Sequence, residues 1–159
     1  MEATDSTAQS AVVTDIAGLP ALAGQELGHT EWAEMTQAQV NAFADATGDH
    51  NFIHVDVERA RQTPFGGTIA HGFLTLSLLA PVTQRLIEVT DANLKINYGL
   101  DRVRFPAPLP VGKRFRSSAK LTEVTPLEGG VQAKVVASVE VEGSEKPALV
   151  AELLLRFYA

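Results

Sequence analysis

Residues 72–89 read GFLTLSLLAPVTQRLIEV, and this stretch decides the fold. Drawn as a helix, it places apolar side chains nearly all round the axis. A helix that is apolar on every side is normally buried on every side. We therefore expect one long buried helix that begins near Gly72. Pro81 is expected to kink it, because proline has no backbone N–H and crowds the carbonyl four residues before it.

The chain after this stretch alternates apolar and polar residues in four runs, which is typical of half-buried strands. The runs cover residues 94–105, 115–121, 131–141 and 149–157. A proline-rich break at 106–110 and a Gly-Gly turn at 129–130 separate three of them. Short turns between such runs predict an antiparallel meander.

A buried helix followed by a curved antiparallel sheet predicts an α+β protein in which the sheet wraps around the helix, the hot-dog arrangement. One wrapped helix leaves little room for a pocket inside a single subunit, so ligands are expected at an edge or between subunits. Because the sheet edges and such a pocket need covering, we expect a homodimer.

The length of 159 residues predicts a single domain. Residues 1–20 are rich in small and polar side chains and are expected to form a flexible tail, which leaves 21–159 as the hot-dog domain. The net charge of -6 argues against nucleic acid as a partner. The absence of cysteine excludes a disulfide scaffold and a thiolate zinc site, and it fits a reducing compartment.

The sequence predicts neither a membrane protein nor a secreted one. Residues 65–84 contain no Asp, Glu, Lys or Arg and are long enough to span a bilayer. Their glycines, histidine, proline and hydroxyls make them too polar for a lipid-facing helix. No basic segment followed by an apolar run stands at the N-terminus, so no secretory signal is expected. We expect a cytoplasmic protein without a membrane partner.

Two shorter helices are expected before the buried one. Thr36 and Gln39 form a capping box at the start of a helix over residues 37–47, and Gly48 stands where a left-handed C-cap belongs. Asp56 can cap a second, shorter helix. The polar segment between the two helices is therefore short and held at both ends.

That polar segment, DHNFIH at residues 49–54, is the first candidate site. Asp49 and His54 can converge in a turn, although they would not converge on one helix. A carboxylate and an imidazole around one water form an acid–base pair whose ordinary pKa values bracket neutral pH. Asn51 can orient either group or the water. The alternative is a helix cap with loop hydrogen bonds, which implies no chemistry.

His71 and Gly72 form the second candidate site. Gly72 opens the buried helix, where unpaired N–H groups and the positive end of the dipole can receive a developing oxyanion. Glycine also lets a substrate carbonyl approach closely. Alternatively, Gly72 fits against the sheet for steric reasons and His71 is a hydrogen-bonded core histidine. The segment around His50 and His54 does not match a metalloprotease helix, so no metal is expected.

Charge is distributed unevenly along the chain. Residues 1–60 carry ten acidic residues and one basic residue, whereas residues 93–122 carry seven basic residues and one acidic residue. Such an asymmetry is typical of a site for an anionic ligand. A solvated strand face would give the same pattern.

Two motifs together resemble a known family. TGDHNFIH at residues 47–54 and IAHGF at residues 69–73 resemble the signature of the MaoC-like (R)-specific enoyl-CoA hydratases, also called hydratase 2. The resemblance extends from about Gly28 to the C-terminus and includes RFPAP at residues 104–108. It is especially close to the NodN-like branch of the family.

The resemblance implies a homodimeric hot-dog enzyme that adds water reversibly to a trans-2-enoyl-CoA and forms the (3R)-3-hydroxyacyl-CoA. The catalytic roles would fall on Asp49 and His54, which hold the water and move its proton to C2, with Asn51 as the motif asparagine. The N–H of Gly72 would bind the thioester oxygen, and His71 would lie at the substrate. No cofactor is implied, because coenzyme A is part of the substrate.

The basic stretch would then bind the phosphates of coenzyme A, with Arg102, Arg104 and Arg116 as the candidates. Two positions depart from the family pattern. Phe52 stands where the family usually has a proline, and Ala80 stands where some members carry a serine.

Two other functions use the same fold. One is a non-catalytic module that binds acyl-CoA. The other is an acyl-CoA thioesterase, which would use a carboxylate from the buried helix, but residues 72–84 contain none. A hydratase is the preferred prediction.

Overall fold

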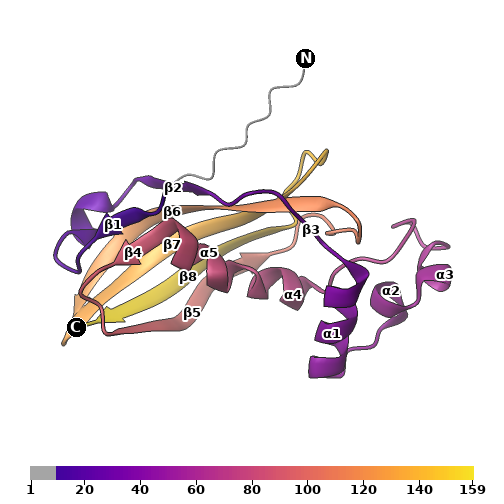
Figure 1. The fold of residues 1–159 in the computed structure, drawn as a ribbon, viewed down its shortest axis with the longest axis horizontal. Coiled ribbons are helices and arrows are strands. Elements are labelled where there is room, and N and C mark those ends of the chain that lie inside the picture. Colours follow the sequence, from indigo (N-terminus) through magenta and orange to yellow (C-terminus); the bar gives the residue numbers. More distant parts are fainter. Residues whose placement is uncertain (1–9) are drawn as a thin grey trace, which may run out of the picture.

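A strongly curved antiparallel sheet covers the central helix in the computed structural model, which describes residues 10–159 (Figure 1). Across the sheet, the strands follow the order β2 (Glu26–His29), β6 (Arg114–Leu127), β7 (Gly130–Val141), β8 (Leu149–Tyr158) and β5 (Leu94–Arg104), with β3 (Ala33–Glu34) also paired to β6. The α+β hot-dog arrangement predicted from the sequence is confirmed.

The core lies between the sheet and the central helix. Along β7 every second side chain is buried, as the alternating sequence predicts. Val135 and Ala137 of this strand belong to the same buried cluster as Leu79, Val82 and Leu86 of the helix. The sheet therefore holds the helix through its inner face.

The central helix consists of α4 (Gly72–Ser77) and α5 (Leu79–Leu86), which meet at Leu78. The break lies three residues before Pro81, in the turn whose geometry the proline ring disturbs, so the predicted kink is confirmed. The predicted burial on every side is wrong for the single chain, because Phe73 is 71% exposed. One face of the helix remains at the surface.

The helix also ends earlier than its apolar pattern predicts. Ile87–Val89 forms strand β4, which pairs in parallel with β1 (Val12–Thr14). A 3-10 helix, Leu19–Leu22, follows β1, and Leu19 is fully buried. Residues 12–20 are thus part of the folded domain and not of a tail, because their apolar side chains reach the core. The remainder of the predicted tail, residues 1–9, lies outside the described residues.

The predicted meander is correct for three strands and wrong for one. β6, β7 and β8 follow one another across the sheet, but β5 pairs with β8 and not with β6. Residues 105–113 therefore cross from one side of the sheet to the other. The alternation of β5 marks it as a strand but carries no information about its partner, which is chosen by packing.

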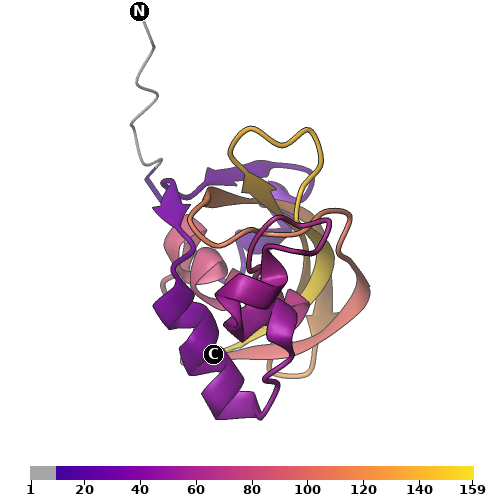
Figure 2. The ribbon, with the colours of Figure 1, turned by 90° about the vertical axis from the view of Figure 1, so that its right-hand side faces the viewer.

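Three helices lie together at one end of the sheet (Figures 1 and 2). They are α1 (Gln37–Thr47), α2 (Phe52–Val55) and α3 (Val57–Ala60). The capping box of Thr36 and Gln39 is present, and Gly48 ends α1 in the left-handed conformation with φ 80. Within residues 10–159, no helix is long and apolar enough to cross a membrane.

Candidate active site

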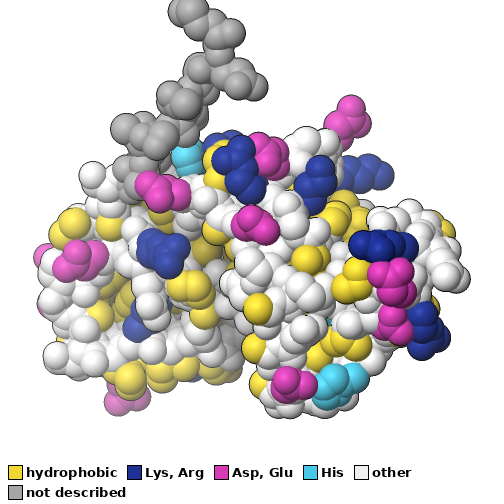
Figure 3. Space-filling model, turned by 45° about the vertical axis from the view of Figure 1, so that its right-hand side comes forward, with side chains coloured by type: hydrophobic (Ala, Val, Ile, Leu, Met, Phe, Trp, Pro, Cys, Tyr) yellow, Lys and Arg dark blue, Asp and Glu magenta, His cyan; other side chains and the backbone are white. Residues whose placement is uncertain are grey.

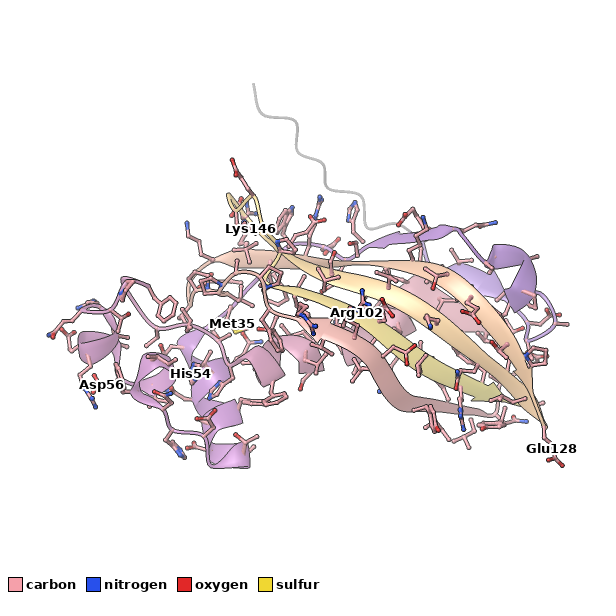
Figure 4. The ribbon with its side chains drawn as sticks, turned by 180° about the vertical axis from the view of Figure 1, so that it is seen from behind. Met35, His54, Asp56, Arg102, Glu128 and Lys146 are labelled. Atoms are coloured by element: carbon pink, nitrogen blue, oxygen red, sulfur yellow. The ribbon has the colours of Figure 1, made fainter. Side chains whose placement is uncertain are left out.

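Asp49, His54 and His71 come together where the helices meet the start of the central helix. One carboxylate oxygen and one ring nitrogen from each histidine lie within 4.8 Å of one another. Asp49 follows α1, His54 belongs to α2, and His71 caps α4. Figure 4 shows His54 among these helices. The convergence of Asp49 and His54 agrees with the sequence prediction.

Asn51 shapes the turn that brings Asp49 and His54 together. Its side-chain oxygen accepts the N–H of Ile53 at 3.4 Å and so caps α2. Its own N–H donates to the Asp49 carboxylate at 3.3 Å. Because α2 begins only at Phe52, Asp49 lies in the turn and the two groups do not share a helix.

His54 is fixed in one tautomer and one orientation. Its side chain is buried, with 7% of the residue exposed, and its Nδ1 donates to the carbonyl oxygen of Ile69 at 2.7 Å. Since a carbonyl can only accept, Nδ1 carries the proton and Nε2 keeps its lone pair. Burial lowers the pKa of the His54 imidazole below its ordinary value, more than the Ile69 carbonyl raises it. His54 is therefore suited to act as a neutral base.

His71 is almost completely enclosed, with 2% of the residue exposed. Its Nε2 donates to the backbone carbonyl of Asp49 at 2.9 Å. Its ring stacks on that of His54, with 3.8 Å between centroids, and Phe43 lies at 4.9 Å on a tilt. These neighbours leave His71 almost no free surface, so its contact with a substrate stays a prediction.

The three side chains have the donor atoms of a metal site but not its geometry. The planes of the two imidazoles differ by only 26°. Ring lone pairs lie in the ring planes, so those of stacked imidazoles lie in two separate, nearly parallel planes and are poorly placed to meet at one ion. The arrangement favours proton transfer over metal coordination.

Gln37 binds the backbone of His54, and the sequence analysis did not identify it as a site residue. Its Nε2 donates to the His54 carbonyl at 2.7 Å and to Asn41 Oδ1 at 2.9 Å. Its Oε1 accepts from the buried Thr68 hydroxyl at 2.6 Å. One amide thus links α1, α2 and the segment before α4. No local signal in the sequence connects positions this far apart.

Gly72 borders a cavity of about 280 Å³ that has both polar and apolar lining. Its other lining residues include Phe65, Thr75, Phe105 and Ala148. A Cβ on Gly72 would lie 3.3 Å from the Phe105 ring, so glycine permits the close approach of that ring to the helix. The first residue of the central helix therefore stands beside an open cavity.

Four of the seven basic side chains in residues 93–122 already bind other side chains of the protein. Lys95 donates to Thr83, Lys120 pairs with Glu26, Arg114 pairs with Glu142, and Arg116 pairs with Glu140 at 2.7 Å. Arg116 also lies over the Trp32 ring, at 4.8 Å from its centroid. Its charge is thus already partnered on the outer face of the sheet.

Arg102 and Arg104 are exposed on β5, and neither has an ion-pair partner among the described residues. Figure 4 shows Arg102 on the sheet and His54 among the helices. Arg104 directly precedes Phe105, whose ring lies against Gly72. The structure therefore places the end of β5 beside the start of the central helix.

A model of the MaoC like domain matches residues 19–143. The 3-hydroxyacyl-thioester dehydratase Z of Mycobacterium tuberculosis (strain ATCC 25618 / H37Rv) is 54% identical over 145 residues, which are 91% of this chain and 96% of the relative. Nodulation protein N of Rhizobium leguminosarum bv. viciae is 45% identical over 139 residues, 86% of each chain.

Solved structures show the same fold. R-Hydratase PhaJ1 from Pseudomonas aeruginosa superposes with a TM-score of 0.70 at 22% identity and covers 84% of this chain and 79% of its own. An (R)-hydratase from A. caviae involved in PHA biosynthesis has a TM-score of 0.69 at 25% identity, covering 84% of this chain and 94% of its own.

Proposed function

Because the chain belongs to the MaoC-like domain family, we propose that it is a 3-hydroxyacyl-thioester dehydratase, a hydro-lyase. The reaction is the reversible addition of water to a trans-2-enoyl-CoA, which gives the (3R)-3-hydroxyacyl-CoA. One observation carries the proposal. A ring nitrogen of the buried His54 imidazole, whose Nδ1 is bound to the Ile69 carbonyl, lies within 4.8 Å of a carboxylate oxygen of Asp49.

The pair supplies the base and the acid that this reaction needs. Water is a weak nucleophile, and C3 of the enoyl group is electrophilic only through conjugation with the thioester. Asp49 and His54 hold the water and take a proton from it as the C3–O bond forms. The same pair returns a proton to C2, so the net change is addition of H and OH across the double bond. No metal or redox cofactor takes part in these steps.

The Gly72 N–H serves as the oxyanion donor in this proposal. Negative charge gathers on the thioester oxygen when water attacks C3. Gly72 is the first residue of the central helix, whose early N–H groups have no partner within the helix. The adjoining cavity, with Phe105 on one side, supports the placement of the thioester carbonyl beside this N–H.

Coenzyme A is proposed to lie along the end of β5. Arg102 and Arg104 are exposed there and are suited to phosphate binding. Arg116 is a weaker candidate than the sequence indicated, because it pairs with Glu140.

The proposed assembly is a homodimer formed through β5. This strand is the edge of the sheet and exposes large apolar side chains, namely Leu94, Ile96, Tyr98 and Leu100. Hydrophobic side chains also reach the surface along the lower edge of the view in Figure 3. An unpaired apolar edge is an unfavourable surface for a monomer, and a second copy would cover it.

A hydration assay tests the function directly. Purified protein is mixed with a chain-length series of trans-2-enoyl-CoAs, loss of enoyl absorbance is followed, and the configuration of the product at C3 is determined. We expect turnover to the (3R) product by the native chain and almost none by Asp49→Asn. Binding without turnover would favour a non-catalytic module, and release of free coenzyme A thiol would favour a thioesterase.

A further inference from the structure

His71 contacts both groups of the proposed acid–base pair, although it offers almost no surface to a substrate. Its Nε2 donates to the Asp49 carbonyl, and its ring lies flat on the His54 ring. We infer that His71 is a positioning residue, which sets the distance between the Asp49 carboxylate and the His54 imidazole. This inference rests on the proposed function, which assigns the water to that pair.

The bond to His71 is the long-range anchor of Asp49. Within the described residues, the other hydrogen bonds of Asp49 stay inside its own turn. They are the bond from its N–H to the Thr47 hydroxyl at 3.4 Å and the bond from the Asn51 N–H to its carboxylate. Only the His71 bond reaches across 22 residues to the start of the central helix. Without it, the exposed turn would have more freedom to move relative to His54.

Packing alone does not explain a histidine at position 71. Its Nδ1 is buried and has no hydrogen-bond partner among the described residues. An unpaired buried acceptor is destabilising, and phenylalanine would fill a similar volume between Phe43 and His54 without one. The group that phenylalanine lacks is the Nε2–H that holds Asp49. Retention of histidine is therefore explained by that donor.

The position of Asp49 has an effect on His54 that can be measured. Burial is the main reason that the pKa of His54 is lowered, and the Ile69 carbonyl and the neighbouring Asp49 carboxylate act in the opposite direction. A variant that lets the Asp49 carboxylate move away from His54 should therefore lower the pKa of His54 further.

Three variants separate the donor from the volume of the side chain. His71→Gln places an amide N–H near the position of Nε2, whereas His71→Asn places one near Nδ1, out of reach of the Asp49 carbonyl. His71→Phe keeps the stacked ring and has no donor. His50→Gln is the matched control, because His50 is exposed and pairs with Asp45 outside the cluster.

We expect kcat for hydration of a trans-2-enoyl-CoA to fall roughly 10- to 100-fold in His71→Asn and His71→Phe, the scale for a misplaced catalytic group. KM should change little, His71→Gln should stay within a few-fold of the native chain, and His50→Gln should match it. Equal activity of His71→Gln and His71→Asn, with losses that follow only the melting temperature, would overturn the inference. A raised KM with unchanged kcat would instead make His71 a substrate-binding group.

Titration of the histidine rings by NMR keeps the two proposals separate. The pKa of His54 is measured without substrate in His71→Gln, which keeps a donor to the Asp49 carbonyl, and in His71→Asn, which does not. A lower His54 pKa in His71→Asn than in His71→Gln supports the inference even if the native chain hydrates no enoyl-CoA, a result that would overturn the proposed function alone. Equal His54 pKa values in the two variants would contradict the inference.

Discussion

Nδ1 of His54 lies 2.7 Å from the carbonyl oxygen of Ile69, and this bond decides which nitrogen of the imidazole is free. Ile69 in turn donates its N–H to the Ile53 carbonyl at 3.0 Å, so the two segments hold each other. The base is thus oriented by backbone atoms, which cannot change their hydrogen-bonding character as a titrating partner could. In the neutral ring the lone pair is therefore always on Nε2.

Removal of either member of the acid–base pair should abolish most of the activity. Asp49→Asn and His54→Ala are each expected to lower kcat by at least ~10²-fold, because each removes a positioned proton carrier. The kcat of the double variant should be scarcely lower than that of the less active single variant, since the two groups act as a unit. Steady-state kinetics and melting temperatures are measured on the same samples. Variants that are less stable but fully active would contradict the catalytic assignment.

The rate of hydration should fall on the acid side of the pH profile. Burial lowers the pKa of His54 below the ordinary 6.5, so the base stays neutral at neutral pH and is lost only as the pH falls through that lowered pKa. The free energy of unfolding should also decrease as the pH falls, because His54 binds a proton more readily in the unfolded chain than in the folded one. The contribution of His54 is present above about pH 6.5 and is lost as the pH falls. Denaturant unfolding at several pH values checks this, with His54→Gln as the variant that should lose the dependence.

Gln37 should affect turnover through His54. Gln37→Leu removes the donor to the His54 carbonyl and leaves the Thr68 hydroxyl without its acceptor. We expect a destabilisation of about 1–3 kcal/mol and a loss of kcat of roughly 10-fold or more. Gln39→Ala is the matched control on the same helix, because it removes half of the capping box and touches nothing in the cluster. Equal kcat values for the two variants would argue against a role for Gln37 in positioning His54.

The chain should be a dimer in solution. Light scattering is expected to give about twice the 17.0 kDa of one chain. Ile96→Lys with Leu100→Glu places charges on the exposed edge of β5 and should shift the mass towards one chain. Val13→Lys, a change at an apolar side chain that is exposed away from β5, should leave the mass unchanged. A native chain that stays monomeric at micromolar concentration would contradict the assembly.

Removal of the arginine charges on β5 should weaken the binding of the coenzyme A substrate and leave the rate of the chemical step nearly unchanged. Arg102→Ala and Arg104→Ala are expected to raise KM and to reduce its dependence on salt, with kcat nearly unchanged. Arg116→Ala should leave KM close to that of the native chain, because Arg116 is paired with Glu140. Kinetics at low and high salt distinguish the three. A rise in KM only in the Arg116 variant would reverse the assignment.

Much of this protein could be predicted from local patterns. The capping box before Gln37, the left-handed Gly48 and the start of the central helix at Gly72 each depend on neighbours along the chain, and each is found where it was expected. The same holds for Asp49 and His54, which a short turn brings together. Hydrogen bonds within a few residues have few alternatives, so the sequence alone determines them.

Tertiary structure decided what depends on distant partners. The pairing of β5 with β8, the burial of Leu19 and the exposure of Phe73 are outcomes of packing among segments far apart in the chain. The same is true inside the site, where the carbonyls of Asp49 and His54 are held by side chains 22 and 17 residues away. Apolar burial is not directional, so a pattern of hydrophobic residues specifies that a segment packs but not which segment it meets. Which segments pack against each other is decided only when the whole chain folds and its apolar surfaces are removed from water together.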